Sequence, residues 1–571
     1  MRRRATRAAA LAALAGCAGR AIPHAQASVG AGTVAGPRTR AERTHYQETS
    51  RYADVVAFVD TLARLAPGVV RTFSMGSTGE GRAIPVVVAS RPAVATPDQA
   101  RRLGRPVVYV QANIHAGEVE GKEALQMLLR DLVLASAPNV LDSLVLVAVP
   151  IYNADGNERV RNQSINRTEQ NGPVLVGQRP NAAGLDLNRD YIKAEAAETR
   201  AALALFAGWD PDVFVDLHTT DGSYHGYALT WSPSLHPAAP LAAYEQDTLL
   251  PRVADRVRVR REFLTFPYGN FAQEYGADVN TDTTKQGWYT YDSRARFGTN
   301  YYGLRGRLSI LSEAFSHDPF ERRVRATYAF VGELLSALAE PPTVARMRVA
   351  RDGDARPDSI VLRTRLTPRP VVRPVLAEDL ARAPDSAQTE PGVPRGLRRT
   401  GHIRTVQLPV YDRFVSTRAT ALPRGGWAFA ADAPGAAQAV ALLQRHGIAV
   451  VRLDRPFTAD GRVFRIDSLI TAARTFQGHH EVRVEGAWRD ERRAFAAGSY
   501  LVPNGRLALV AGALLEPESD DGLVTWNVWD GALRSGGDFP VVRVRDPRMP
   551  AADPPPRIAP RVDTAGSPRR P

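Results

Sequence analysis

Apolar and polar positions along the first 340 residues follow two spacings, one typical of buried strands and one typical of helices. Short apolar runs rich in β-branched residues predict strands, and apolar residues three and four apart predict amphipathic helices. The predicted strands are at residues 84–89, 107–114, 144–150, 213–218 and 308–315. The predicted helices are at residues 52–65, 119–129, 194–206 and 322–338.

These strands alternate with helices, an order typical of a sheet that is covered by helices on both faces. Three polar residues, His115, His218 and Glu313, fall towards the carboxyl ends of strands. Sheets of this kind bind ligands at that edge. The sequence therefore predicts an α/β fold in which the three side chains meet on one rim.

The turn after the second predicted strand contains His115 and Glu118. At a strand-to-helix turn, an imidazole and a carboxylate three residues apart can point at one place, as the first two ligands of a divalent metal do. The pattern is common by chance, and a solvated turn is the alternative. His218 supplies the third ligand that zinc hydrolases use, and a histidine at the edge of the core is its alternative interpretation.

The chain changes character after residue 340. Residues 341–400 are rich in Pro and Arg, which predicts a linker with one strand at 359–365. Residues 401–545 predict a second, smaller α/β or α+β domain, with Trp526 and Trp529 in its core. Its predicted elements are a helix at 436–446 and strands at 426–430, 447–453, 498–503 and 514–517. No motif in this domain predicts a chemical role.

Composition narrows the class of partner. The chain has 571 residues, which is too long for one ordinary core, and 44% of them are apolar, as in globular proteins. A net charge of +13 suggests nucleic acid at first. However, Lys122, Lys193 and Lys285 are the only lysines, and the arginines are interleaved with acidic residues rather than clustered. No nucleic-acid partner is expected, and the oligomeric state stays open.

Residues 1–17 predict a signal peptide of the bacterial lipoprotein type. Basic residues precede an apolar run at 8–15 that is too short to span a bilayer, and Cys17, the only cysteine, follows. Acylation of Cys17 predicts an exported protein, periplasmic or on the cell surface, with a lipid anchor in the membrane. Ordinary secretion with cleavage after Ala27 is the alternative. The remaining predicted segments are a tether at 18–43, the main domain at 44–340 and a disordered tail at 546–571.

Five motifs occur in the order and approximate spacing of the zinc carboxypeptidases, the M14 metallopeptidases. They are His115-Ala116-Gly117-Glu118, Tyr152-Asn153-Ala154-Asp155-Gly156, Asp186-Leu187-Asn188-Arg189, Asp216-Leu217-His218 and Ser312-Glu313. The chain resembles this family over roughly residues 44–340. The resemblance implies a mixed, mostly parallel sheet with helices on both faces.

The resemblance also implies a zinc site. His115, Glu118 and His218 would hold one zinc ion per chain, and Glu313 would be the general base of hydrolysis. An acid inside an apolar strand needs such an explanation, because burying a charge is costly. A structural ion pair is the alternative for Glu313.

Further residues match the substrate-binding positions of the family. Asn188 and Arg189 would bind the C-terminal carboxylate of a peptide, since a guanidinium can bind a carboxylate bidentately. A surface charge is the alternative for Arg189. Arg167 would stabilise the developing oxyanion, although Arg159 and Arg161 compete for this role.

The tyrosine that caps the substrate in this family matches Tyr291 best, with Tyr289, Tyr301 and Tyr302 close by. One departure from the family pattern and one unassigned residue bear on the substrate. Asp190 follows Arg189 where the family often has Asn, and an acid there would weaken the grip on a carboxylate or favour a basic substrate. The residue that sets the side-chain preference lies within 278–296, where surface solvation is the alternative role of its two acids. These acids are Asp282 and Asp292.

The sequence thus predicts an exported zinc metallocarboxypeptidase that acts on peptides with a free C-terminus. One alternative keeps the zinc site but changes the substrate, as in an amidase of cell-wall peptides or acylated amino acids. The other is a non-catalytic binding lipoprotein on a peptidase fold. A complete ligand set together with Glu313 argues against the binding protein, which has no need of a base.

Overall fold

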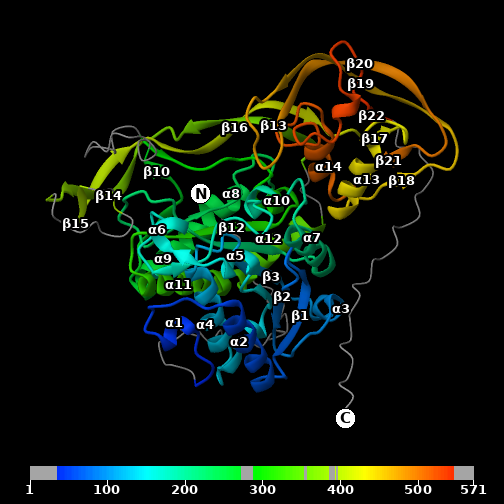
Figure 1. Ribbon diagram of the computed structural model, residues 1–571. Helices are drawn as coiled ribbons and strands as arrows, with labels where there is room; N and C mark the ends of the chain where they lie inside the picture. Colours follow the sequence, from blue (N-terminus) through cyan, green and yellow to red (C-terminus); the bar gives the residue numbers. More distant parts are fainter. Residues whose placement is uncertain (1–34, 272–286, 353–356, 385–392, 394–395, 546–571) are drawn as a thin grey trace, which may run out of the picture.

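The computed structural model describes residues 35–271, 287–352, 357–384, 393 and 396–545 (Figure 1). The predicted signal peptide, with Cys17, and the predicted tail lie outside these residues. Within the described ranges, no helix is both long and apolar enough to cross a membrane.

An eight-stranded mixed sheet lies at the centre of the first domain (Figure 1). Its strands are β1 Val70–Ser77, β2 Ala83–Ala89, β3 Val107–Ala112, β4 Val145–Val149, β7 Val213–Thr219, β8 Leu229–Ser232, β9 Thr265–Pro267 and β12 Leu308–Ala314. They lie in the order β1-β2-β4-β3-β7-β12-β8-β9. The central strands β4, β3, β7 and β12 are parallel, and their antiparallel neighbours are β2 and β8. The predicted α/β fold class is confirmed.

The two faces of the sheet bury different side chains, because successive residues of a strand point to opposite sides. In β2, Val86 and Val88 belong to one apolar core, whereas Val87 and Ala89 belong to the other. The core with Val87 is covered by α2 Tyr52–Leu65, α4 Glu120–Leu134, α9 Leu250–Arg261 and α11 Phe320–Leu338. The core with Val86 is covered by α3 Pro97–Leu103, α7 Ala197–Trp209 and α10 Gly298–Leu304.

Every strand and helix predicted in the first domain is present, and α2 has the predicted bounds. The sequence predicted no strand at the position of β1. Most side chains of this edge strand are exposed or half-buried, so it contains no apolar run. The predicted tether is also shorter than expected. Its residues 35–43 pack on the domain, with α1 Arg40–Arg43 and an ion pair of 2.7 Å between Glu42 and Arg130.

The strand predicted at 359–365 is confirmed as part of β13 Ser359–Pro368, but the predicted linker around it also contains regular structure. The same region includes α12 Pro341–Asp352 and β14 Arg373–Arg382. β13 pairs with β16 Val410–Ala421, and β14 pairs with β15 Leu397–Leu408, so the four strands make a long ribbon (Figure 1). Both faces of such a ribbon carry polar residues such as Thr364 and Arg365. The alternation typical of a half-buried strand is therefore missing from the sequence.

A six-stranded antiparallel sheet forms the rest of the second domain. Its strands are β17 Gly426–Phe429, β18 Val451–Arg452, β19 Phe457–Thr471, β20 Val482–Phe495, β21 Tyr500–Val502 and β22 Val542–Val544. Its helices are α13 Ala436–Arg445 and α14 Ala508–Leu515. The strand predicted at 514–517 is wrong, because Leu514 and Leu515 end α14, which is buried on all sides and has no polar face to reveal a helix. Trp526 and Trp529 are buried, as predicted.

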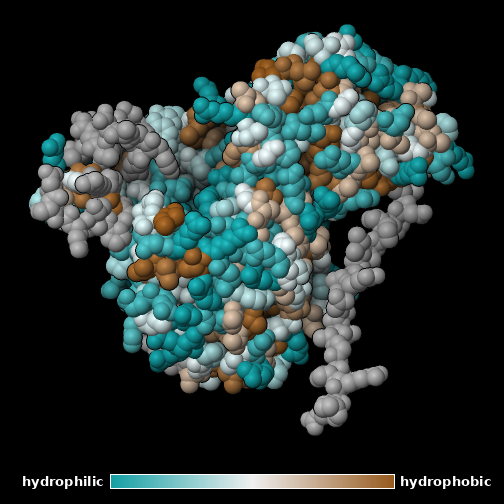
Figure 2. Space-filling model, in the orientation of Figure 1, coloured by the Kyte–Doolittle hydropathy of each residue, from teal (hydrophilic) through white to brown (hydrophobic). Residues whose placement is uncertain are grey.

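The second domain packs directly on the first. One apolar core includes Phe206 and Tyr301 of the first domain together with Trp427, Leu443 and Leu515 of the second. Outside this core the surface is largely hydrophilic, with apolar residues in separate patches on the face seen in Figure 2. The two domains are therefore joined by a buried apolar layer rather than by a flexible link.

Candidate active site

A tight turn after β3 places His115 and Glu118 side by side. Asn113 has a left-handed backbone (φ 65°). Its side-chain amide donates to the carbonyl oxygens of Ala116 and Glu118, both at 3.3 Å. The Glu118 N–H donates to the carbonyl of His115 (3.0 Å). These bonds close the turn, so the imidazole and the carboxylate are fixed before α4 begins.

The third predicted ligand, His218, lies on β7, next to Glu313 on β12. The parallel register pairs Glu313 with His218, so both side chains emerge on the same face of the sheet. α4 lies close against this edge, because a Cβ on Gly121 would come within 2.7 Å of Leu217 Cβ. The glycine therefore lets the helix that follows Glu118 approach the strand that carries His218.

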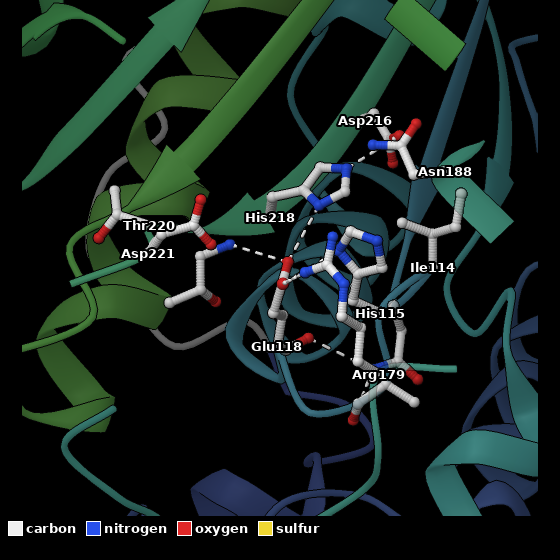
Figure 3. A network of polar contacts seen from close by, with 12 residues as sticks. Ile114, His115, Glu118, Arg179, Asn188, Asp216, His218, Thr220 and Asp221 are labelled. Atoms are coloured by element: carbon white, nitrogen blue, oxygen red, sulfur yellow. Dashed lines mark hydrogen bonds and ion pairs between the residues drawn. The ribbon is translucent and has the colours of Figure 1, made fainter. Parts of the chain in front are cut away.

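Both imidazoles turn the same ring nitrogen inward. The Nδ1 atoms of His115 and His218 lie 3.0 and 2.9 Å from the two carboxylate oxygens of Glu118 (Figure 3). The three residues are buried, and one donor atom from each lies within 4.8 Å of the others. The structure thus brings the three predicted ligands together.

Two aspartates hold the outward nitrogens of these histidines. His115 Nε2 lies 3.0 Å from Asp186 Oδ1, and His218 Nε2 lies 3.0 Å from Asp216 Oδ2. A carboxylate on the outer nitrogen fixes the orientation and tautomer of a metal-binding histidine. Sequence reasoning included both aspartates in motifs but missed this role. The available signal was an acid two residues before Asn188 and two residues before His218.

This donor set fits one zinc ion. Zinc in hydrolases takes three protein ligands with nitrogen and oxygen donors and keeps one open position. Burial by itself raises the pKa of Glu118, but the neighbouring His115 and Arg167 hold that pKa well below its usual range, so the carboxylate is ionised. An ionised, buried carboxylate between two oriented imidazoles is the arrangement that a divalent cation needs.

Glu313 has the environment of a proton acceptor. Its side chain lies at the edge of the core and is only 9% exposed. Burial, with the nearby carboxylates of Glu118 and Asp221, raises its pKa well above the usual range, against the opposite effect of His218. Such shifts are typical of catalytic acids and bases. No ion pair involving Glu313 is found among the described residues, so the structural ion pair considered above gains no support.

Asn188 and Arg189 lie beside the triad in η2 Leu187–Arg189. The Asn188 side-chain oxygen accepts a hydrogen bond from the Gly298 N–H (2.9 Å). The Arg189 guanidinium lies over the Phe297 ring, 4.0 Å from its centroid, and donates to the Asn188 carbonyl. Within the described part of the chain it has no carboxylate partner, and burial lowers its pKa. A desolvated guanidinium without a counterion is suited to bind an anion.

A family model described as zinc carboxypeptidase matches residues 55–295. This segment matches the zinc carboxypeptidase family, M14, over less than half of the chain. The match covers β1 to β4, β7 and the triad, in agreement with the geometry above.

Individual relatives cover less of the chain. Carboxypeptidase 2 of Trichophyton rubrum is 28% identical over 24% of this chain and 23% of its own length. The catalytic chain of human carboxypeptidase N is 27% identical over 34% of this chain and 44% of its own length. The chain thus spans less than half the length of these relatives. The solved metallo-carboxypeptidase of Burkholderia cenocepacia covers 51% of this chain and 69% of its own, with 20% identity and a TM-score of 0.37.

Asp190, the departure from the family pattern, faces away from the carboxypeptidase site. Its carboxylate accepts hydrogen bonds from Lys193 Nζ (2.8 Å) and from the backbone N–H groups of Glu195 and Ala196 (3.1 and 2.9 Å). These partners lie at the beginning of α7. The Asp190 carboxylate thus has partners within the chain, and its effect on the carboxylate grip of Arg189 stays a prediction.

Two arginines approach Glu118, and only one of them faces solvent. Arg167 is 4% exposed, lies 3.1 Å from Glu118 and donates to the Thr220 carbonyl (3.0 Å). Arg179 is 34% exposed and lies 3.4 Å from Glu118 and 3.0 Å from Asp186. Arg167 is therefore the buried partner of Glu118, whereas Arg179, which sequence reasoning missed, is its partly exposed partner (Figure 3).

Tyr291, the best-matching candidate for the capping tyrosine, lies near Glu313. It lines a pocket of about 380 Å³ with Asp221, Tyr268 and Tyr289. Burial raises the pKa of Tyr291, and Glu313 adds to this effect, which places the phenol near the base. The other candidates have different surroundings, although Tyr289 lines the same pocket. Tyr289 stacks on Tyr411, and Tyr301 and Tyr302 are in the core.

Of the two acids considered for side-chain preference, Asp292 is paired within the chain. Asp292 accepts hydrogen bonds from the Arg294 backbone N–H (2.9 Å) and from Arg294 Nε (2.6 Å). The arginine holds the pKa of Asp292 below its usual value although burial raises it. Asp282 lies outside the described residues.

The zinc site makes a prediction about its outer aspartates. The wild-type protein should bind about one zinc ion per chain, and Asp216→Asn should weaken zinc binding by about 10–100-fold, because it loosens His218. Titration against a chromophoric chelator measures both quantities. His402→Ala is the control, since His402 is exposed on β15 and pairs with Asp379. Wild-type affinity in Asp216→Asn would rule out this role.

Proposed function

We propose that this protein is a zinc-dependent carboxypeptidase that removes residues from the C-terminal end of peptides. The observation that carries the proposal is the register of β7 and β12, which sets Glu313 beside His218 and hence beside the predicted metal ligands. A metal site with an adjacent, desolvated carboxylate has the two functional parts that hydrolysis by an activated water requires.

The side chains of the site have separate roles in the proposed reaction. When bound, zinc polarises the scissile carbonyl and lowers the pKa of a water molecule. The Glu313 carboxylate takes the proton of the attacking water and delivers it to the leaving amine. Its raised pKa supports this role, because a carboxyl group must hold the proton between the two steps. Asp186 and Asp216 keep the imidazoles in place throughout.

Arg189 supports action at the end of a peptide rather than within it. Its guanidinium lies beside Asn188 and has no carboxylate partner among the described residues, so a peptide C-terminus would supply the missing anion. Tyr291 borders the adjacent pocket, where the last side chain of the substrate would lie. Both features favour an exopeptidase.

We assign the stabilisation of the developing oxyanion to Arg179 instead of Arg167. A group with this role must face the substrate, and preorganised donors contribute most where charge develops in the transition state. Arg179 combines partial exposure with proximity to Glu118, whereas Arg167 is covered by Thr219 and Thr220.

Two alternatives are kept as outcomes of the tests. An amidase of cell-wall peptides or acylated amino acids would use the same metal ligands and the same base. A non-catalytic binding lipoprotein would bind peptides without cleaving them. We also propose export with acylation at Cys17, which rests on the residue pattern of the first 17 residues. Metabolic labelling with a fatty acid, compared between the wild type and Cys17→Ser, tests the anchor.

Glu313→Gln should retain zinc but lose hydrolysis. The amide cannot accept a proton, so kcat should fall by at least about 100-fold, the usual scale of general base catalysis. Rates are measured on a library of peptides by mass spectrometry, alongside a zinc titration. Glu321→Gln is the control, since Glu321 is exposed and pairs with Arg325. An active Glu313→Gln protein would mean that the base is elsewhere.

The carboxylate grip predicts a dependence on the free C-terminus. Arg189→Ala should raise KM for such peptides about tenfold or more, the loss expected for a charge-assisted hydrogen bond, without weakening zinc binding. Arg159→Ala is the matched control, because that arginine pairs with Glu80 on the surface. Equal cleavage of peptides with amidated C-termini would contradict the exopeptidase proposal and favour the amidase.

Substitutions of Arg179 and of Arg167 should affect different quantities, kcat in the first case and zinc affinity in the second. Arg179→Ala should lower kcat by about 100-fold, as for loss of one oxyanion donor, and change zinc affinity little. Arg167→Ala should mainly weaken zinc binding, because Glu118 loses a buried counterion. Steady-state kinetics at saturating zinc separate the two effects. The reverse pattern would restore the oxyanion role to Arg167.

A further inference from the structure

The second domain touches the metal site through the loop that joins β19 to β20. In this loop, Gln477 has a left-handed backbone (φ 50°), and Gly478 follows with φ 82°. The two residues turn the chain sharply, so the Gln477 side chain extends towards the first domain. Its Oε1 atom accepts a hydrogen bond from the backbone N–H of Asp186 (2.9 Å).

Asp186 is a central residue of the site. Its carboxylate contacts His115 Nε2 (3.0 Å), receives the Asn188 N–H (3.0 Å) and pairs with Arg179 (3.0 Å). A displacement of this residue would therefore turn a metal ligand and move two substrate-binding side chains. Gln477 is the second-domain side chain that bonds the backbone at this point.

A second bond from the same loop braces the following turn. His479 Nε2 lies 2.9 Å from Glu195 Oε1, and His479 Nδ1 lies 2.9 Å from Asn527. The other carboxylate oxygen of Glu195 pairs with Lys193, whose ammonium also binds Asp190. The loop thus holds both ends of the segment from 186 to 195, which contains Asn188 and Arg189.

The second domain, from which the loop extends, is joined to the first domain by further buried polar contacts. His446 is buried and bonds the Tyr301 hydroxyl (2.7 Å) and the Ile192 carbonyl (3.1 Å). Asp521 binds Arg296 Nε (2.9 Å), five residues after Tyr291. These contacts hold the second domain on the first domain.

We infer that the second domain completes the active site, with Gln477 as a positioning residue that holds Asp186 and, through it, His115, Asn188 and Arg179. The inference rests on the proposed peptidase function for its kinetic consequences only. Gln477 contacts neither the predicted ligands nor the place of the substrate. Its effect is transmitted through one backbone hydrogen bond, so the role of Gln477 can be tested separately from the zinc ligands.

The test compares Gln477→Leu with His480→Leu in the full-length protein. Leucine keeps roughly the size of glutamine but cannot accept the Asp186 N–H. His480 is exposed in the same loop and its side chain bonds the Ala472 carbonyl (2.8 Å), so its replacement controls for a change in the loop. Hydrogen exchange of a peptide covering 185–191 is measured by mass spectrometry, together with zinc affinity, kcat and KM.

Gln477→Leu should exchange at least tenfold faster in this peptide, bind zinc severalfold more weakly and show a lower kcat even at saturating zinc. His480→Leu should match the wild type in all four quantities. Unchanged exchange and kinetics in Gln477→Leu would overturn the inference, as would equal effects of the two substitutions. If the wild type cleaves no peptide, the proposed function fails, while exchange and zinc affinity still decide the role of Gln477.

Discussion

The parallel pairing of β3, β7 and β12 is the constraint on which the rest of the site depends. The pairing brings the carboxyl ends of these strands to one edge, so residues about 95 to 105 positions apart in the sequence become neighbours. Once the register is set, His218 and Glu313 share a face, and the turn after β3 has only to present His115 and Glu118 to the same place. The outer aspartates and the arginines then act on an arrangement that the sheet has already made.

The sequence predicted this part well because the chemistry there is local. Each motif combines an apolar strand with a polar residue at its end, and both signals can be read from a few consecutive positions. The fold class, the central strands and the zinc ligand set follow from such signals. The acid at 186 and the acid at 216 were visible in the same way, yet their role depends on which ring nitrogen each one faces, and only the structure shows that.

The remaining errors have a common cause, which is dependence on distant partners. The ribbon of β13 to β16 is polar on both faces and obtains its regular structure from pairing, so its residues resemble a linker. α14 is apolar all round because two domains enclose it. Arg167 and Arg179 lie in the same stretch between two motifs. Arg167 is buried and bonds the carbonyls of Thr219 and Thr220, whereas Arg179 is partly exposed, and only the structure shows this difference.

The apolar core shared by the two domains has a consequence for folding. Removing the chain after residue 340 would expose the aromatic faces of Phe206 and Tyr301 to water and leave the second half without the surface that covers Trp427 and Leu515. Each domain also has an apolar core made only of its own residues, so the shared layer couples the stability of the two domains without being the only core of either. A substitution that loosens the shared layer should therefore lower the stability of both domains.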